Sequence, residues 1–177
     1  MKSPRRQIDG LGLSSVKILY CTFVRSHLEY ASEIWNPCYL KYIDRIERIQ
    51  KRFIKYLCFH QRIPYKSENY LDLCRKYHLL PLNIRRKVSD CVFILKTLNS
   101  TINSPDILSK FYLNVPCKSK RFYPPLRVPL ASSNYRQNSF VLRASRSFNE
   151  MCKQHDIDPF LTSVSSARRC LTLNFFK

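Results

Sequence analysis

The sequence predicts a mainly α-helical protein: a small helical bundle, a proline-rich extended segment, and C-terminal helices. Apolar residues recur at three- and four-residue spacings over several long stretches, which is the period of an amphipathic helix. Five prolines lie between 99 and 139, where they remove backbone donors and exclude long helices. We therefore expect an unplaced segment at 1–15, a helical domain at 16–98, a proline-rich basic loop region at 99–138, and helices at 139–177.

The first helix is expected to begin after Ser14 or Ser15, either of which can cap it, and to end near Tyr30. Residues 33–37 then break the helical pattern, because a proline disfavours helix in the residue before it. Trp35, the only tryptophan, falls in this break. We interpret it as an apolar anchor of the turn rather than as a base-stacking residue.

The second helix, from about Tyr39 to Phe59, is the clearest element of the sequence. Its inward face is apolar apart from one glutamine: Ile43, Ile46, Ile49, Gln50, Phe53, Ile54 and Leu57. At about 100° per residue, five cations fall within an arc of about 80° on the opposite side. This basic stripe consists of Lys41, Arg45, Arg48, Arg52 and Lys55, with Asp44 and Glu47 outside it.

The basic stripe has two interpretations. A row of charges is often only a solvated helix face. Like charges three or four residues apart on a helix, however, repel one another by a few tenths of a kcal/mol per pair. An anion facing the stripe would remove that cost, so the stripe also favours an anionic partner.

Two helices follow the stripe. Ser67 is expected to cap a short helix that ends near Tyr77, and Asn83 a longer one that ends near Leu98. The inward side chains of the longer helix are Ile84, Val88, Cys91, Val92, Leu95 and Leu98. Its first turn carries three cations that are expected to point outward: Arg85, Arg86 and Lys87. Cations at this end oppose the helix macrodipole, so local stability does not explain them and a binding role is favoured.

In the proline-rich region we expect a short helical turn at 105–110 and a strand at 112–115. Basic residues alternate there with aromatic ones: Lys118, Lys120, Arg121, Phe122, Tyr123, Arg127, Tyr135 and Arg136. This alternation suits phosphate contact and base stacking, and equally a loop packed on the helical core. Ser139 is expected to cap a helix over 140–153, and residues 158–159 to begin the last helix, because proline suits the first helical position.

The composition favours a polyanionic partner. The 177 residues include 31 Lys and Arg against 12 Asp and Glu, a formal net charge of +19, and such an excess opposes compaction. The charge and the pI together favour nucleic acid over an anionic membrane. No stretch reaches the ~20 apolar residues of a membrane span, and the start lacks the apolar core of a secretory signal. We expect an intracellular protein, cytoplasmic or nuclear, that is not secreted.

Motifs for catalysis, cofactors or metals are missing from the sequence. The only two glycines, Gly10 and Gly12, cannot form a phosphate-cradling loop. No carboxylate pair sits in a strand–turn setting that would hold two metal ions, and no serine lies in a GxSxG motif. The eight cysteines include no CxxC pair, so free thiols are expected rather than a zinc site. We expect no cofactor, no metal and no catalysis by this chain.

A series of short motifs runs in order along the chain: FVRSHLEYAS at 23–32, WNP at 35–37, IDRIERIQKRF at 43–53, LPLNIRRK at 80–87, INSPDIL at 102–108, VP at 115–116, Arg121, NY at 134–135 and RASRSFN at 143–149. This series resembles the region that follows the polymerase core in non-LTR retrotransposon reverse transcriptases, most closely the jockey-like elements. The resemblance extends from about Val16 to Leu171. It rests on the order of the motifs, because no single motif is specific.

The resemblance implies a thumb-like helical domain of an RNA-directed DNA polymerase, which grips the backbone of the template–primer duplex. The parent protein would also carry an endonuclease and a palm with metal-binding aspartates. Neither is present in this sequence, so no catalytic residue can be transferred. The expected nucleic-acid contacts are Lys41, Arg45, Arg48, Arg52, Lys55, Arg85, Arg86, Lys87 and Arg121. Two other interpretations stay open: a host-adopted protein-interaction module and a non-functional remnant reading frame.

Overall fold

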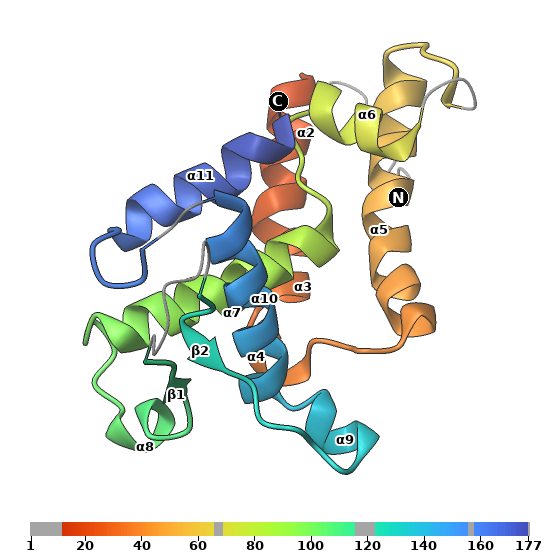
Figure 1. Cartoon of the computed structure of the whole chain (residues 1–177). Coiled ribbons are helices and arrows are strands. Elements are labelled where there is room, and N and C mark those ends of the chain that lie inside the picture. Colours follow the sequence, from red (N-terminus) through yellow and green to blue (C-terminus); the bar gives the residue numbers. More distant parts are fainter. Residues whose placement is uncertain (1–11, 66–68, 116–122, 156–157, 177) are drawn as a thin grey trace. The chain divides into compact units, whose positions relative to one another are not determined.

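The computed structural model describes residues 12–65, 69–115, 123–155 and 158–176. It is mainly helical, with 68% helix and one small two-stranded sheet, which confirms the predicted fold class (Figure 1). The chain forms two compact units. Unit 1 contains Met1–Ala31 and Tyr39–Leu82, and unit 2 contains Ser32–Cys38 and Asn83–Lys177. The boundary at Leu82 falls inside the predicted 16–98 segment, because the helix that follows it belongs with the C-terminal elements.

The described part of unit 1 begins with a helical run that ends one residue before the predicted Tyr30. It consists of α2 (Leu13–Leu19), the π-helical stretch η1 (Tyr20–Arg25) and α3 (Ser26–Glu29). The predicted serine cap is wrong: Gly12 occupies the N-cap position with an extended backbone, and Ser14 and Ser15 lie inside the first turn. The Gly12 carbonyl accepts the Val16 amide at 3.2 Å.

The remaining helices of unit 1 are α5 (Leu40–His60) and α6 (Tyr70–Lys76). The predicted helix at 39–59 is thus confirmed to within one residue at each end. For α6, Asn69 is the N-cap residue, and the predicted cap Ser67 lies outside the described residues. Figure 1 shows α6 beside the C-terminal part of α5. The core of the unit consists of Val16, Tyr20, Ile54, Leu57, Cys58, Leu73, Cys74, Leu79, Leu80 and Leu82.

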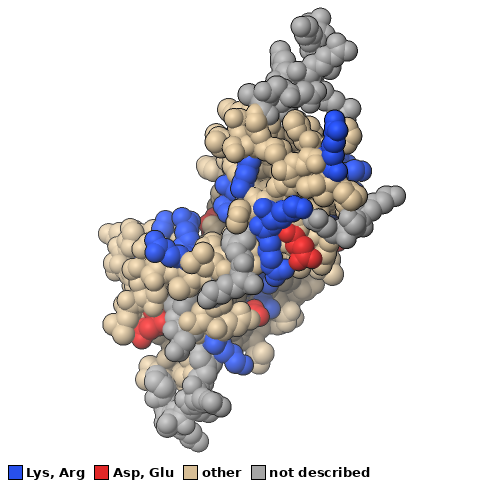
Figure 2. Space-filling model, turned by 90° about the horizontal axis from the view of Figure 1, so that it is seen from above, with Lys and Arg blue, Asp and Glu red and all other residues tan. Residues whose placement is uncertain are grey.

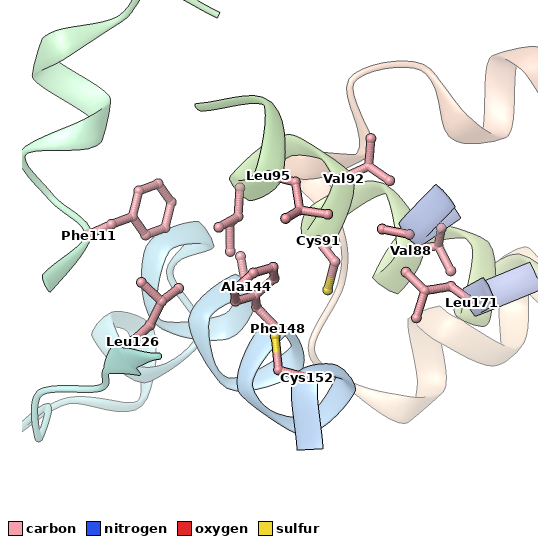
Figure 3. Close-up of a cluster of buried hydrophobic side chains, with 12 residues drawn as sticks. Val88, Cys91, Val92, Leu95, Phe111, Leu126, Ala144, Phe148, Cys152 and Leu171 are labelled. Atoms are coloured by element: carbon pink, nitrogen blue, oxygen red, sulfur yellow. The ribbon is translucent and has the colours of Figure 1, made fainter. Parts of the chain in front are cut away.

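Unit 2 is built on three longer helices: α7 (Leu82–Leu98), α10 (Phe140–His155) and α11 (Val164–Phe176). Four of the predicted inward residues of α7 are buried: Val88, Cys91, Val92 and Leu95. They pack with Ala144, Phe148 and Cys152 of α10 and with Ala167 and Leu171 of α11. Figure 3 shows Cys91 of α7 directed toward Phe148 of α10, and Val88 of α7 on the side of Leu171. Helices predicted from periodicity alone therefore meet along their predicted apolar faces.

The short elements of unit 2 include the predicted turn and strand of the proline-rich region. The turn is α8 (Pro105–Leu108), and the strand is β1 (Tyr112–Leu113), which pairs antiparallel with β2 (Leu126–Arg127). Asn149 of α10 anchors β2, because its side chain accepts the Leu126 amide at 3.0 Å and donates to the Leu126 carbonyl. The other two short helices are α4 (Ser32–Trp35) and α9 (Asn134–Gln137). The break predicted at 33–37 therefore starts with one helical turn.

Two predicted helix starts are wrong. Asn83 lies inside α7, which already begins at Leu82. The last helix begins at Val164 rather than at Pro159, because Asp158 uses its carboxylate to form a turn with the amides of Phe160 and Leu161. The Ser163 hydroxyl then accepts the Ser166 amide at 3.2 Å and caps α11.

Candidate nucleic-acid interface

Helix α5 presents the basic stripe to solvent. All five of its cations are exposed, as the sequence predicts: Lys41, Arg45, Arg48, Arg52 and Lys55. Successive members are four, three, four and three residues apart, so the stripe extends about 21 Å along a helix that rises about 1.5 Å per residue. One strand of a DNA duplex carries a phosphate about every 3.4 Å of axis. The stripe therefore matches the length of about six phosphates of one strand.

On the face of α5 that points away from the stripe, the buried carboxylate of Glu47 ties the helix to the rest of unit 1. Glu47 is 5% exposed and accepts hydrogen bonds from the Tyr70 hydroxyl and, at 3.0 Å, from the Leu82 amide. Burial, together with the hydrogen bond to Glu47, raises the pKa of the Tyr70 hydroxyl well above its usual value. Tyr70 therefore stays a hydrogen-bond donor to Glu47 at all physiological pH values.

Gln50, one turn further along α5, completes this buried polar network. Its side-chain amide donates to the Leu80 carbonyl at 3.0 Å, and its carbonyl accepts the Tyr20 hydroxyl at 3.2 Å. The Tyr20 ring stacks on Phe53 with 3.9 Å between centroids. Because Glu47 and Gln50 both have specific buried partners, α5 cannot rotate about its axis without leaving polar groups unsatisfied. The network thus fixes which face of α5 reaches solvent.

No ion pair joins a stripe cation to a carboxylate in the part of the chain that the structure describes. The ion pairs found there join Arg25 to Glu29, Arg75 to Asp72, and Arg143 to Asp90, and none involves the stripe. Figure 2 shows one face of the molecule, on which Lys and Arg atoms are more abundant than Asp and Glu atoms. Charges without a partner keep their full attraction for an external anion.

An exposed aromatic residue extends the stripe, and sequence reasoning missed it. Phe59 lies eighteen residues after Lys41, which is about five helical turns, so it falls on the same line of α5. Its side chain is 82% exposed. Positive charge combined with exposed aromatic rings is typical of surfaces that bind unpaired bases. The signal was present in the sequence, because the spacing of four from Lys55 continues the pattern of the stripe.

The structure overturns one predicted contact residue. Arg86 was expected to point outward, but it is 1% exposed. Its Nε donates to the Asn36 side chain at 2.9 Å, and its guanidinium lies 6.0 Å from the centre of the Trp35 ring. A residue buried this way cannot reach a phosphate. Trp35 itself is 40% exposed and serves as the expected anchor of the turn only in part, through this cation–π contact.

The remaining predicted contacts have different environments. Arg85 is half-buried and Lys87 is exposed, and both lie on α7 in unit 2, whereas the stripe belongs to unit 1. Arg121 lies outside the described residues. Arg127 and Arg136 of the proline-rich region are exposed, as is Tyr135 at 90%. Among the described residues, the stripe is therefore the one predicted group of cations whose members are all exposed on a single element.

Among the described residues, no three or more His, Cys, Asp or Glu side chains lie close enough together to hold a metal ion. The seven described cysteines are free. Burial raises the pKa of Cys74 and of Cys152 to about 11, and that of Cys91 well above its usual value. These thiols pack as small apolar side chains.

The fold and the exposed cations of α5 define a basic, mainly helical protein with a cationic helix face. No protein-family model, no curated protein and no solved structure matches the chain. In the described residues, no helix is long and apolar enough to cross a membrane.

Proposed function

We propose that the chain binds nucleic-acid duplexes through the basic stripe of α5, by contact with the phosphate backbone and without reading the base sequence. The observation that carries this proposal is the set of five exposed cations on one helix face, none of which has a carboxylate partner among the described residues. Phosphate contacts position a protein on a duplex but carry no sequence information directly. Bound phosphates would also relieve the mutual repulsion of the five cations.

The test of this proposal compares two variants that lose the same charge from different places. In the stripe variant, Arg45, Arg48 and Arg52 become Gln. In the control variant, three exposed cations outside the stripe become Gln: Lys76, Lys110 and Lys153. With a 20-base-pair RNA/DNA hybrid at fixed salt, we expect the stripe variant to bind about tenfold or more weakly and the control within about threefold of the wild type. Equal losses in both variants would contradict a localised interface.

From the resemblance we further propose that the chain is the thumb and downstream region of a jockey-like non-LTR retrotransposon reverse transcriptase. The ligand of the stripe would then be the template–primer duplex, and the polymerase palm would be its covalent neighbour in the parent protein. The motif IERIQ at 46–50 supports this proposal, because its two buried polar residues, Glu47 and Gln50, anchor α5 in unit 1 and leave Arg48 exposed in the stripe. This chain, without a palm, would not polymerise.

The test of that assignment is the sequence of the transcript upstream of the Met1 codon. We expect an in-frame extension that encodes a palm with paired metal-binding aspartates. A transcript start and an in-frame stop codon just before Met1 would contradict it, and only the binding proposal would then stand.

A second candidate function, protein binding, is favoured by one observation. Large apolar side chains of the first helical run are exposed, among them Ile18 at 64% and Phe23 at 65%. Exposed apolar patches mark protein contacts. Such a host-adopted interaction module would form a stoichiometric complex that survives high salt and is lost in an Ile18→Ser, Phe23→Ser variant. A remnant reading frame without function would show neither kind of binding.

A further inference from the structure

An open cavity in unit 2 combines an apolar floor with a cationic rim. Its volume is about 630 Å³, and it lies between α7 and α11. This is the size range of pockets that hold small organic ligands. The lining residues are Val92, Lys96, Val164, Ser165, Arg168, Arg169 and Thr172.

The lining carries three positive charges and no negative charge. Lys96 is half-buried, whereas Arg168 and Arg169 are exposed. None of the three has a carboxylate partner among the described residues. The first turn of α11, which includes Val164 and Ser165, adds the partial positive charge of a helix N-terminus. An anion in this cavity would relieve the repulsion among these groups.

The floor of the cavity narrows the class of anion. Val92 is 4% exposed and Val164 is half-buried, so these two side chains form an apolar wall of the open cavity. A small hydrated anion gains nothing from such a wall, since apolar burial stabilises only ligands with an apolar surface of their own. A ligand with a flat apolar body and two or three negative charges can pack on the apolar floor and also contact the cations of the rim.

We propose that the cavity between α7 and α11 binds an organic polyanion with a flat apolar body, which is the chemistry of a nucleotide. The apolar body packs on Val92 and Val164, and the charged groups face Lys96, Arg168 and Arg169. The proposal does not depend on nucleic-acid binding by α5, because the two sites share no residue.

The test is titration calorimetry of the full chain with three probes in magnesium-free buffer: ATP, adenosine and inorganic tripolyphosphate. We expect ATP to bind with a stoichiometry of one and at least about tenfold more tightly than either of its parts. An Arg168→Gln, Arg169→Gln variant should lose about tenfold or more in ATP affinity, whereas the stripe variant should keep the wild-type value.

Two outcomes would overturn the proposal. Tripolyphosphate binding as tightly as ATP would show attraction by charge alone, without use of the apolar floor. An equal loss of ATP affinity in the stripe variant would place the bound ATP on α5. Unchanged Trp35 fluorescence in the Arg168→Gln, Arg169→Gln variant would verify that unit 2 keeps its fold.

Discussion

Single residues decide which face of α5 is exposed to solvent. Glu47 and Asp44 both lie outside the basic stripe in sequence, yet Asp44 is exposed and Glu47 is buried with two donors. Helical periodicity identifies the apolar face but does not show whether a polar residue at its margin will find partners. Those partners, Tyr70 and Leu82, come from residues more than twenty positions away. Their positions follow from tertiary structure and not from the local pattern.

Replacement of Glu47 tests this role. Glu47→Ala should lower the free energy of unfolding of unit 1 by about 2 kcal/mol or more, because two buried donors lose their acceptor. Glu47→Gln should cost less, since its amide retains an acceptor and the Tyr70 hydroxyl can accept its N–H. Urea denaturation followed by circular dichroism measures both. Asp44→Ala is the matched control, with an expected change within about 0.5 kcal/mol, and a similar cost for all three substitutions would refute the role.

Arg86 is the clearest residue that sequence reasoning misplaced. It lies opposite the apolar face of α7, where solvent is expected. A segment about fifty residues earlier, which carries Trp35 and Asn36, covers it instead. Asp90 on α7 is covered in the same way by Arg143 of α10, whose Nε donates to it at 3.1 Å. Burial raises the pKa of Asp90, and the hydrogen bond from Arg143 acts against that rise.

Substitution of Arg86 should therefore affect stability and not binding. Arg86→Gln should lower the stability of unit 2 by about 2 kcal/mol, because a buried hydrogen-bonded guanidinium is lost, while duplex affinity stays close to wild type. Lys87→Gln, at the exposed neighbouring position, should leave stability within about 0.5 kcal/mol. Trp35 fluorescence in urea reports the unfolding of this unit. A stable Arg86→Gln variant with weakened duplex binding would restore the original prediction of a contact residue.

At the scale of elements, the long helices were predictable and the ends of several helices were not. Repeated apolar spacings identified α5, α7 and α10, because burial of one face dominates their stability. Start positions depend on a few local hydrogen bonds that compete with one another. Asp158 formed a turn instead of starting a helix, and Ser163 capped α11 five residues later. Either residue type is an acceptable cap by sequence.

Repulsion among the cations of the basic stripe should destabilise α5 when no ligand is bound. Each neighbouring pair of cations is expected to destabilise the helix by about 0.2–0.5 kcal/mol at low ionic strength. The stripe variant, with Arg45, Arg48 and Arg52 changed to Gln, should thus unfold at a higher urea concentration, by about 1 kcal/mol in free energy. The difference should shrink in 1 M salt, where charges are screened. A stripe variant less stable than the wild type at low salt would contradict this reading of the helix face.

At the scale of the whole molecule, the formal charge of +19 is shared by both units, each of which contains more Lys and Arg than Asp and Glu. The net charge predicted an anionic partner but could not localise it. To locate the surface that would bind the anion, the solvent exposure of each cation must be known. That information excludes the buried Arg86 as a contact and retains the five exposed cations of the stripe. The same information revealed Phe59 and the cavity of unit 2, whose lining comes from helices about seventy residues apart in sequence.

Thiol reactivity tests whether the chain adopts this fold as a whole. Cys38 and Cys170 are exposed, whereas Cys74, Cys91 and Cys152 are buried with raised pKa values. Because burial raises the pKa of each of these thiols, to about 11 for Cys74 and Cys152, they are almost entirely protonated at pH 8 and are poor nucleophiles. Ellman's reagent at pH 8 should therefore modify Cys38 and Cys170 rapidly, and the buried thiols only after unfolding in urea. Equal, rapid reaction of all cysteines in native buffer would favour an unfolded remnant.

The central claim, that the basic stripe of α5 binds the phosphates of a duplex, is tested most directly by the salt dependence of binding. For contact with about five phosphates, the logarithm of the affinity for a B-DNA duplex should fall with the logarithm of salt concentration with a slope of about −4.5. In the stripe variant the slope should change to about −1.8, because three contacts are lost. An identical slope in wild type and stripe variant would show that these cations do not touch the duplex and would contradict the claim.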